Sequence, residues 1–268
     1  MISPPHLPPE LLDRVIDFLC DSSDALISCC LVSKSLIPRT RKHLFAEVEF
    51  QTTYDLESWK AFSDPTTSPA SYAKTLVIRC PGVIAAAGIS REGDCWVSAF
   101  SHVTHLTIYT LKRGSGQIPT SLIPFHGFSP ALRSLRVTSS AFAPSQIFNP
   151  ICSFPLLEDL SVNTPYYGPI EDGDYLFESQ STIIQPSSSP AFTGSMELYA
   201  SVWIGPFVSR LLSLPKGLYS RNPDLTWDRG VDISPSMKLI EGCCSTIESL
   251  KIDVGQFGML VWCPRPHQ

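Results

Sequence analysis

The sequence predicts an α/β protein in which a small helical lobe is followed by a stack of repeated strands. Three observations predict this fold: an amphipathic pattern before residue 45, five similar apolar phrases along the remainder, and helix-forming segments between the later phrases. The chain has 268 residues, of which 43% are hydrophobic and 17% charged. It is therefore long enough to bury a core, and it lacks the charge excess of disordered chains.

The first 45 residues predict three short helices. The first starts at Pro8 and Pro9, because a missing N–H costs nothing in the first helical turn. Its apolar side chains recur with helical spacing at Leu11, Leu12, Val15, Ile16 and Leu19. A second helix carries Leu26, Cys29 and Cys30, and a third runs from Ser33 towards Phe45, bent or restarted at Pro38.

The chain divides into three parts. Residues 1–50 form the helical domain and end in an alternating segment, 46–50, that predicts a first strand. Residues 51–71 form a connecting strand and linker, and residues 72–268 form the repeated region. A Pro-, Gly-, Ser- and acid-rich segment at about 164–192 predicts a long exposed loop in that region.

The repeated region contains five phrases with apolar residues at positions 0, 3 and 5. Their central leucines, separated by 30, 29, 25 and 90 residues, are Leu76, Leu106, Leu135, Leu160 and Leu250. Positions 3 and 5 share one face of a strand. A single unit cannot bury this apolar face, but stacked units can. We expect parallel, adjacent strands in that order, with room for unrecognised copies in the last gap.

The repeats match the strand segment of a leucine-rich repeat. The Asn or Cys that this repeat carries three positions beyond its last apolar residue is missing, so we expect an irregular solenoid. The positions concerned are Pro81, Leu111, Ser140, Pro165 and Gly255. Five unrelated amphipathic strands of an α/β sheet are the alternative.

Helices are predicted from Pro206 to Pro215 and from an N-cap at Ser234 to Cys244.

Composition argues against several classes of partner. The net charge of −5 and the pI of about 5.7 favour neither nucleic acid nor an anionic membrane. The short basic run 39–43 fits a solvated helix face better than a nucleic-acid contact. Nine cysteines without any CxxC motif indicate reduced thiols in the cytosol or nucleus. Neither a signal peptide nor an 18-residue apolar run occurs.

The sequence contains few signs of chemistry. Hydrolase, phosphate-binding, dinucleotide-binding and HExxH motifs are absent. His102 and His105 would fall on opposite faces of a strand, and the acidic cluster 171–174 lacks the full calcium-loop pattern. Cys243 and Cys244 lie on a predicted apolar helix face and fit a core better than a reactive site. We therefore expect no catalytic residue, cofactor or metal.

The opening stretch "LPPELLDRVIDFL…ALISCCLVSKSL", over about residues 5–45, resembles the F-box motif. Later phrases are similar to the F-box-like proteins that are abundant in mushroom-forming fungi. Leu36 stands where the family often has Trp. Leucine keeps an apolar anchor at this position but loses aromatic area. The resemblance implies that the adaptor subunit of a ubiquitin ligase is contacted by Leu7, Pro8, Leu11, Leu12, Val15, Ile16, Leu19, Leu31, Val32 and Leu36.

The resemblance thus implies a three-helix F-box followed by a leucine-rich-repeat-like solenoid. It also implies a non-catalytic substrate receptor of an SCF-type cullin–RING ubiquitin ligase, with an unknown target protein held by the repeats. Three short helices cannot make a stable core alone, and an apolar surplus fits a partner's groove. The alternative is an interaction protein outside any ligase, whose F-box-like helices pack on its own repeats.

Overall fold

We describe the fold from a computed structural model, for residues 8–62, 68–79, 96–110, 128–139, 147–148, 151–163, 190–200, 204–227, 232–253 and 259–262. Several positions named above lie outside these ranges: Leu7, Pro81, Leu111, Ser140, Gly255, and residues 164–189 of the predicted loop, which include Pro165 and the acidic cluster 171–174. Among the described helices, none is long and apolar enough to cross a membrane.

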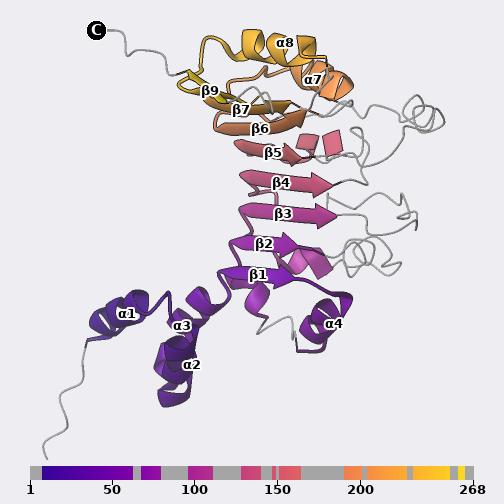
Figure 1. The fold of residues 1–268 in the computed structure, drawn as a ribbon. Helices are drawn as coiled ribbons and strands as arrows, with labels where there is room; N and C mark the ends of the chain where they lie inside the picture. The colour runs from indigo at the N-terminus through magenta and orange to yellow at the C-terminus, as the bar shows by residue number, and fades with distance from the viewer. Residues whose placement is uncertain are drawn as a thin grey trace, which may run out of the picture.

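In the described part of the chain, an open sheet of nine strands runs in chain order (Figure 1). Strands β1 to β8 are parallel, and β9 is antiparallel to β8. The strands are β1 (Glu47–Phe50), β2 (Thr75–Ile78), β3 (His105–Thr110), β4 (Ser134–Ser139), β5 (Asp159–Asn163), β6 (Ser195–Ala200), β7 (Asn222–Trp227), β8 (Leu250–Asp253) and β9 (Met259–Trp262). The chain is therefore an α/β protein with a parallel sheet, as predicted.

The register confirms the predicted alignment of the first four central leucines. Leu76 pairs with Leu106, Leu106 with Leu135, and Leu135 with Leu160. These strands are therefore parallel and adjacent in the predicted order. The Leu160 and Leu250 strands are not adjacent, because β6 and β7 lie between them, in the gap where the sequence left room for unrecognised copies. These two copies lack the leucine signal: Met196 and Pro223 occupy the position of the central leucine.

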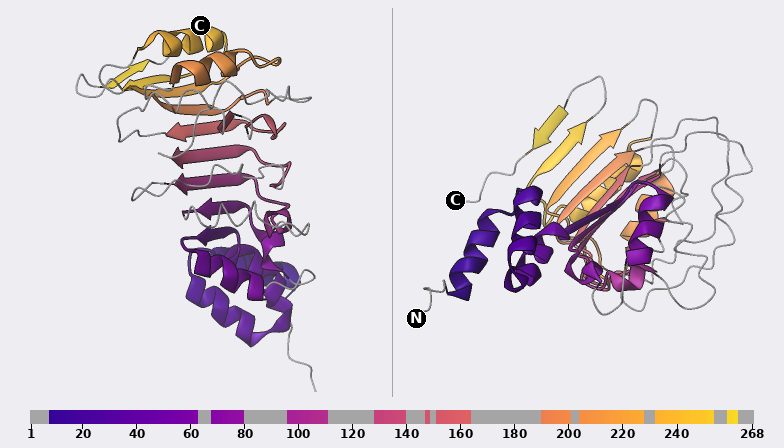
Figure 2. Two further views of the ribbon diagram at one scale, coloured as in Figure 1. Left: turned by 90° about the vertical axis from the view of Figure 1, so that its right-hand side faces the viewer. Right: turned by 90° about the horizontal axis from the view of Figure 1, so that it is seen from below.

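Alternation along the strands sends one set of side chains into a core and the other to an open face. Leu135 and Val137 are each 1% exposed, while the intervening Arg136 is exposed. The core lies between the sheet and a layer of irregular segments and helices. Helices α4, α7 and α8 lie on the same side of the sheet (Figure 2, right).

Helices α4 (Thr53–Phe62), α7 (Ile204–Leu212) and α8 (Ser234–Cys243) supply this layer, together with short 3-10 turns. Their buried residues Leu56, Leu211 and Leu239 belong to the same core as the strand leucines. The predicted N-cap at Ser234 is wrong by one position, because Ser234 is already helical. Its N–H and hydroxyl both donate to Asp232 Oδ1, at 2.9 and 2.7 Å.

The helical lobe stands at the β1 end of the sheet (Figure 1). It consists of α1 (Pro9–Phe18), α2 (Ser23–Val32), the 3-10 turn η1 (Lys34–Leu36) and α3 (Ile37–Leu44). Ser22 caps α2 through its side chain, which accepts from the Ala25 N–H. The predicted break near Pro38 lies between η1 and α3, where this proline occupies the first helical turn.

Candidate functional site

Large apolar side chains remain in solvent on the two outer helices of the lobe. On α1 they have the spacing of one helix face: Leu11 is 46% exposed, Val15 51% and Phe18 87%. On α2 the exposed apolar side chains are Ile27, Leu31 and Val32, of which the last two are 84% and 80% exposed. We call these six residues the apolar lobe surface. Burying such side chains would be favourable, so they form a candidate binding surface.

The structure separates the residues that the F-box resemblance implies into exposed, partly buried and buried positions. Leu11, Val15, Leu31 and Val32 are exposed, and so is Pro8, which precedes the first turn of α1. A second group, which the lobe itself covers in part, consists of Leu12, Leu19 and Leu36. Ile16 is only 1% exposed and packs inside the lobe.

Neither Ile16 nor Leu26, the buried residue of α2, joins the core beneath the sheet, although both are only 1% exposed. Ile16 is buried on α1 and Leu26 on α2, and each of these helices contacts α3. The lobe therefore uses only part of its apolar surface for its own packing. The remainder, the apolar lobe surface, stays uncovered among the described residues.

Polar contacts of two side chains, Asp17 and Cys30, fix the lobe helices to α3. Asp17 on α1 accepts hydrogen bonds from the guanidinium of Arg39 and, at 2.7 Å, from His43 Nε2. These bonds hold the pKa of the Asp17 carboxyl well below its ordinary value. On α2, Cys30 Sγ lies 2.8 Å from the Oγ1 atom of the fully buried Thr40. Together they orient α1 and α2, and with them the exposed apolar residues.

The open face of the sheet is the second candidate surface, and it is polar. One row of the register runs across β4 to β8 through Arg136, Ser161, Glu197, Asp224 and Lys251. These side chains border a shallow hollow of about 300 Å³. We call the face that carries this row the open sheet face.

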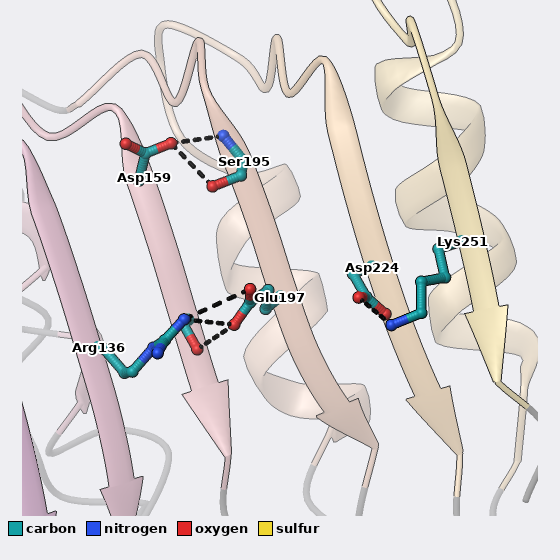
Figure 3. Close-up of polar contacts among 7 residues, drawn as sticks. Arg136, Asp159, Ser195, Glu197, Asp224 and Lys251 are labelled. Atoms are coloured by element: carbon teal, nitrogen blue, oxygen red, sulfur yellow. Dashed lines mark hydrogen bonds and ion pairs between the residues drawn. The ribbon is translucent and has the colours of Figure 1, made fainter. Parts of the chain in front are cut away.

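Charges on the open sheet face are paired across strands (Figure 3). Glu197 Oε2 accepts from Arg136 at 3.2 Å and from Ser161 Oγ at 2.8 Å. Lys251 Nζ donates to Asp224 Oδ2 at 2.7 Å, which raises the pKa of Lys251. Exposed pairs of this kind contribute about 0–1 kcal/mol to stability. They fix the orientation of these polar groups more than they stabilise the fold.

A further polar contact lies at the beginning of β6 on the same face. The carboxylate of Asp159 accepts hydrogen bonds from the N–H and the hydroxyl of Ser195, at 2.6 and 2.8 Å (Figure 3). It fixes the start of β6 beside β5, in a strand that the repeat pattern does not reveal.

Sequence reasoning missed two members of the apolar lobe surface and the whole charged row of the sheet. Phe18 lies seven residues after Leu11, and Ile27 lies four before Leu31, so helical spacing contains the signal for both. The charged row contains residues from β6 and β7, the two strands that the repeat pattern did not reveal. Its composition therefore followed only from the register.

The described residues contain no group of three or more His, Cys, Asp or Glu side chains that could hold a metal ion. His102 lies in the turn before β3 rather than on it, and both it and His105 are exposed. The thiols of Cys152 and Cys243 are buried, which raises the pKa of Cys152 to about 11 and that of Cys243 above its ordinary value. Such thiols are poor nucleophiles.

Comparison with known proteins does not assign the chain. No model of a known protein family matches it, and no curated protein is significantly similar to it. The two surfaces described above are therefore the basis for a functional assignment.

Proposed function

We propose that this protein is the substrate-receptor subunit of an SCF-type cullin–RING ubiquitin ligase. In this proposal the apolar lobe surface docks on the adaptor subunit of the ligase. The observation that carries the proposal is the exposure of large apolar side chains on the first two helices of a chain whose opening resembles the F-box. The protein itself performs no chemistry, because ubiquitin transfer belongs to other subunits.

The apolar lobe surface has the properties of helix-in-groove docking. Leu11, Val15 and Phe18 recur at the spacing that lines one side of a helix. Complete burial of one such side chain contributes about 1.5–3 kcal/mol. Several anchors of this kind are enough for a specific complex once the cost of association is subtracted.

The open sheet face is the proposed contact for the target protein. It lies on the opposite side of the sheet from the core, and its polar groups are already oriented by cross-strand pairs such as Arg136 with Glu197. Oriented groups lose little conformational freedom on binding, which favours affinity and specificity.

The proposal is tested by measuring adaptor binding with variants of matched exposure. Phe18→Asp and Leu31→Asp each place a carboxylate where the complex would bury it without a partner. We expect a loss of two to three decades of affinity, at about 1.4 kcal/mol per decade, with an unchanged melting temperature. Tyr54→Asp is the control, because Tyr54 is 78% exposed but lies on α4.

The results distinguish the proposed ligase receptor from the alternative function, an interaction protein outside any ligase. No adaptor binding by the wild-type protein would favour the alternative. Full binding by both α1 and α2 variants would exclude the apolar lobe surface as the interface. If either variant lowered the melting temperature by many degrees, the lobe helices would be packed on the protein's own repeats in solution.

A further inference from the structure

Strand β1 forms the first edge of the sheet, and half of its backbone groups face away from β2. In β2, β3 and β4, the residue that opens the strand donates its N–H to the carbonyl just before the preceding strand: Thr75 to Ala46 O, His105 to Lys74 O and Ser134 to Thr104 O, at 2.9–3.0 Å. Glu47 occupies this position in β1, and no strand precedes β1 among the described residues.

The same alternation applies to Glu49. The carbonyls of Ala46 and Phe50 accept from β2, so the backbone groups of residues 47 and 49 point to the other side. A strand of this kind is a template for a further strand, because its N–H and C=O groups are spaced for pairing. The question is which strand it would accept.

A groove accompanies this edge. It has a volume of about 520 Å³ and lies between β1 and the helix α4. Its aromatic wall is formed by Phe45 and Trp59, whose rings pack edge to face with centroids 6.2 Å apart. The groove therefore offers apolar contacts beside the unpaired backbone of the strand.

The charged side chains that line the groove are all acidic. They are Glu47, Glu49 and Asp55. Asp55 Oδ2 accepts the N–H groups of Gln51 and Thr52, and Glu49 is paired with Arg79, the residue that follows β2. Glu47 is exposed and makes no ion pair with any described residue. An acidic edge disfavours pairing with a second copy of β1, because like charges would lie opposite each other.

We propose that the β1 edge binds an extended basic segment of another protein by adding it to the sheet as a strand. Side chains on alternate positions of that segment share a face. Lys or Arg at these positions lies beside Glu47 and Glu49, and the intervening apolar side chains face Phe45 and Trp59. The backbone pairs with the outward groups of residues 47 and 49.

The test measures binding of a fluorescent hexapeptide, Lys-Val-Lys-Val-Lys-Val, to the whole protein by fluorescence anisotropy. Two peptides control for its chemistry: the same sequence N-methylated at all backbone amides, and Glu-Val-Glu-Val-Glu-Val. We expect binding of the first peptide only. Equal binding of the N-methylated peptide would show that charge alone attracts it and would overturn strand addition.

Variants place the peptide on this edge. Glu47→Lys should weaken binding at least tenfold. Glu47→Pro should weaken binding as much, because proline removes the outward N–H of residue 47, which makes no hydrogen bond to β2. Glu241→Lys, an equal charge reversal on the exposed surface of α8, should leave binding unchanged. Unchanged binding by Glu47→Lys would overturn the proposal. A β1-mediated dimer of the wild-type protein in sedimentation would overturn the choice of occupant.

Discussion

The carboxylate of Asp17 on α1 accepts a hydrogen bond from His43 Nε2 on α3 at 2.7 Å, although the two residues are 26 positions apart. Arg39, one turn before His43, binds the same carboxylate. This acceptor thus fixes the outermost helix of the lobe, which carries half of the apolar lobe surface.

Replacing Asp17 with Asn should loosen α1 at neutral pH, because the amide loses the charge that Arg39 and His43 contact. The pKa of Asp17 is lowered in the folded state, so its contribution is present above the ordinary carboxyl pKa and is lost as the pH falls below it. Amide hydrogen exchange of α1 should therefore distinguish the wild type from Asp17→Asn at pH 7 but less at pH 3. A difference that grew on acidification would contradict this sign. Asp13→Asn, an exposed acid on the same helix, is the control.

Ile16 and Phe18 should respond in opposite ways to truncation. Ile16→Ala removes a buried side chain and leaves a cavity in the lobe, so we expect the lobe to lose about 2–5 kcal/mol of stability. Phe18→Ala removes a side chain that is 87% exposed and should change stability by less than about 0.5 kcal/mol. Urea unfolding followed by circular dichroism measures both. Equal losses would mean that Phe18 is buried in solution.

Ser236 on α8 should matter for stability although it is small. Its hydroxyl accepts a hydrogen bond of 2.7 Å from Trp227 Nε1 on β7, and both residues are buried. Ser236→Ala leaves that indole N–H unpaired, at a cost of about 1–3 kcal/mol. Denaturant unfolding should show a lower midpoint. Ser234→Ala, at the exposed start of the same helix, should have a smaller effect, and an equal or larger one would contradict the role of the buried bond.

Gly194 should not tolerate a side chain. A Cβ atom there would lie 2.2 Å from Asp159 Oδ1, the atom that accepts both hydrogen bonds from Ser195. Gly194→Ala should displace that carboxylate and cost about 1–3 kcal/mol, which thermal unfolding would detect. Gly205→Ala is the matched control, because its Cβ would meet its nearest neighbour, Pro235, at 3.4 Å. Identical melting temperatures for Gly194→Ala and the wild type would show that Asp159 can move without loss.

The sequence alone determined the local elements and much of their order. Helical spacing before residue 45 predicted the lobe helices, and the recurring leucines predicted a parallel stack from Leu76 to Leu160. Both signals are local, because amphipathic periodicity follows from the geometry of a single helix or strand. Strands β6 and β7 escaped prediction because Met196 and Pro223 replace the expected leucine, while packing against aligned neighbours still buries both positions.

Only the tertiary structure decided which apolar residues of α1 are buried and which remain free. Its apolar residues extend around the helix from Leu11 to Phe18, and the sequence does not say where α3 covers them. In the folded lobe, where α1 contacts α3, Ile16 is buried and Val15 and Phe18 remain in solvent. The same holds for Asp17 and His43, because a hydrogen bond between residues far apart in sequence depends on how two helices pack, which no local pattern records.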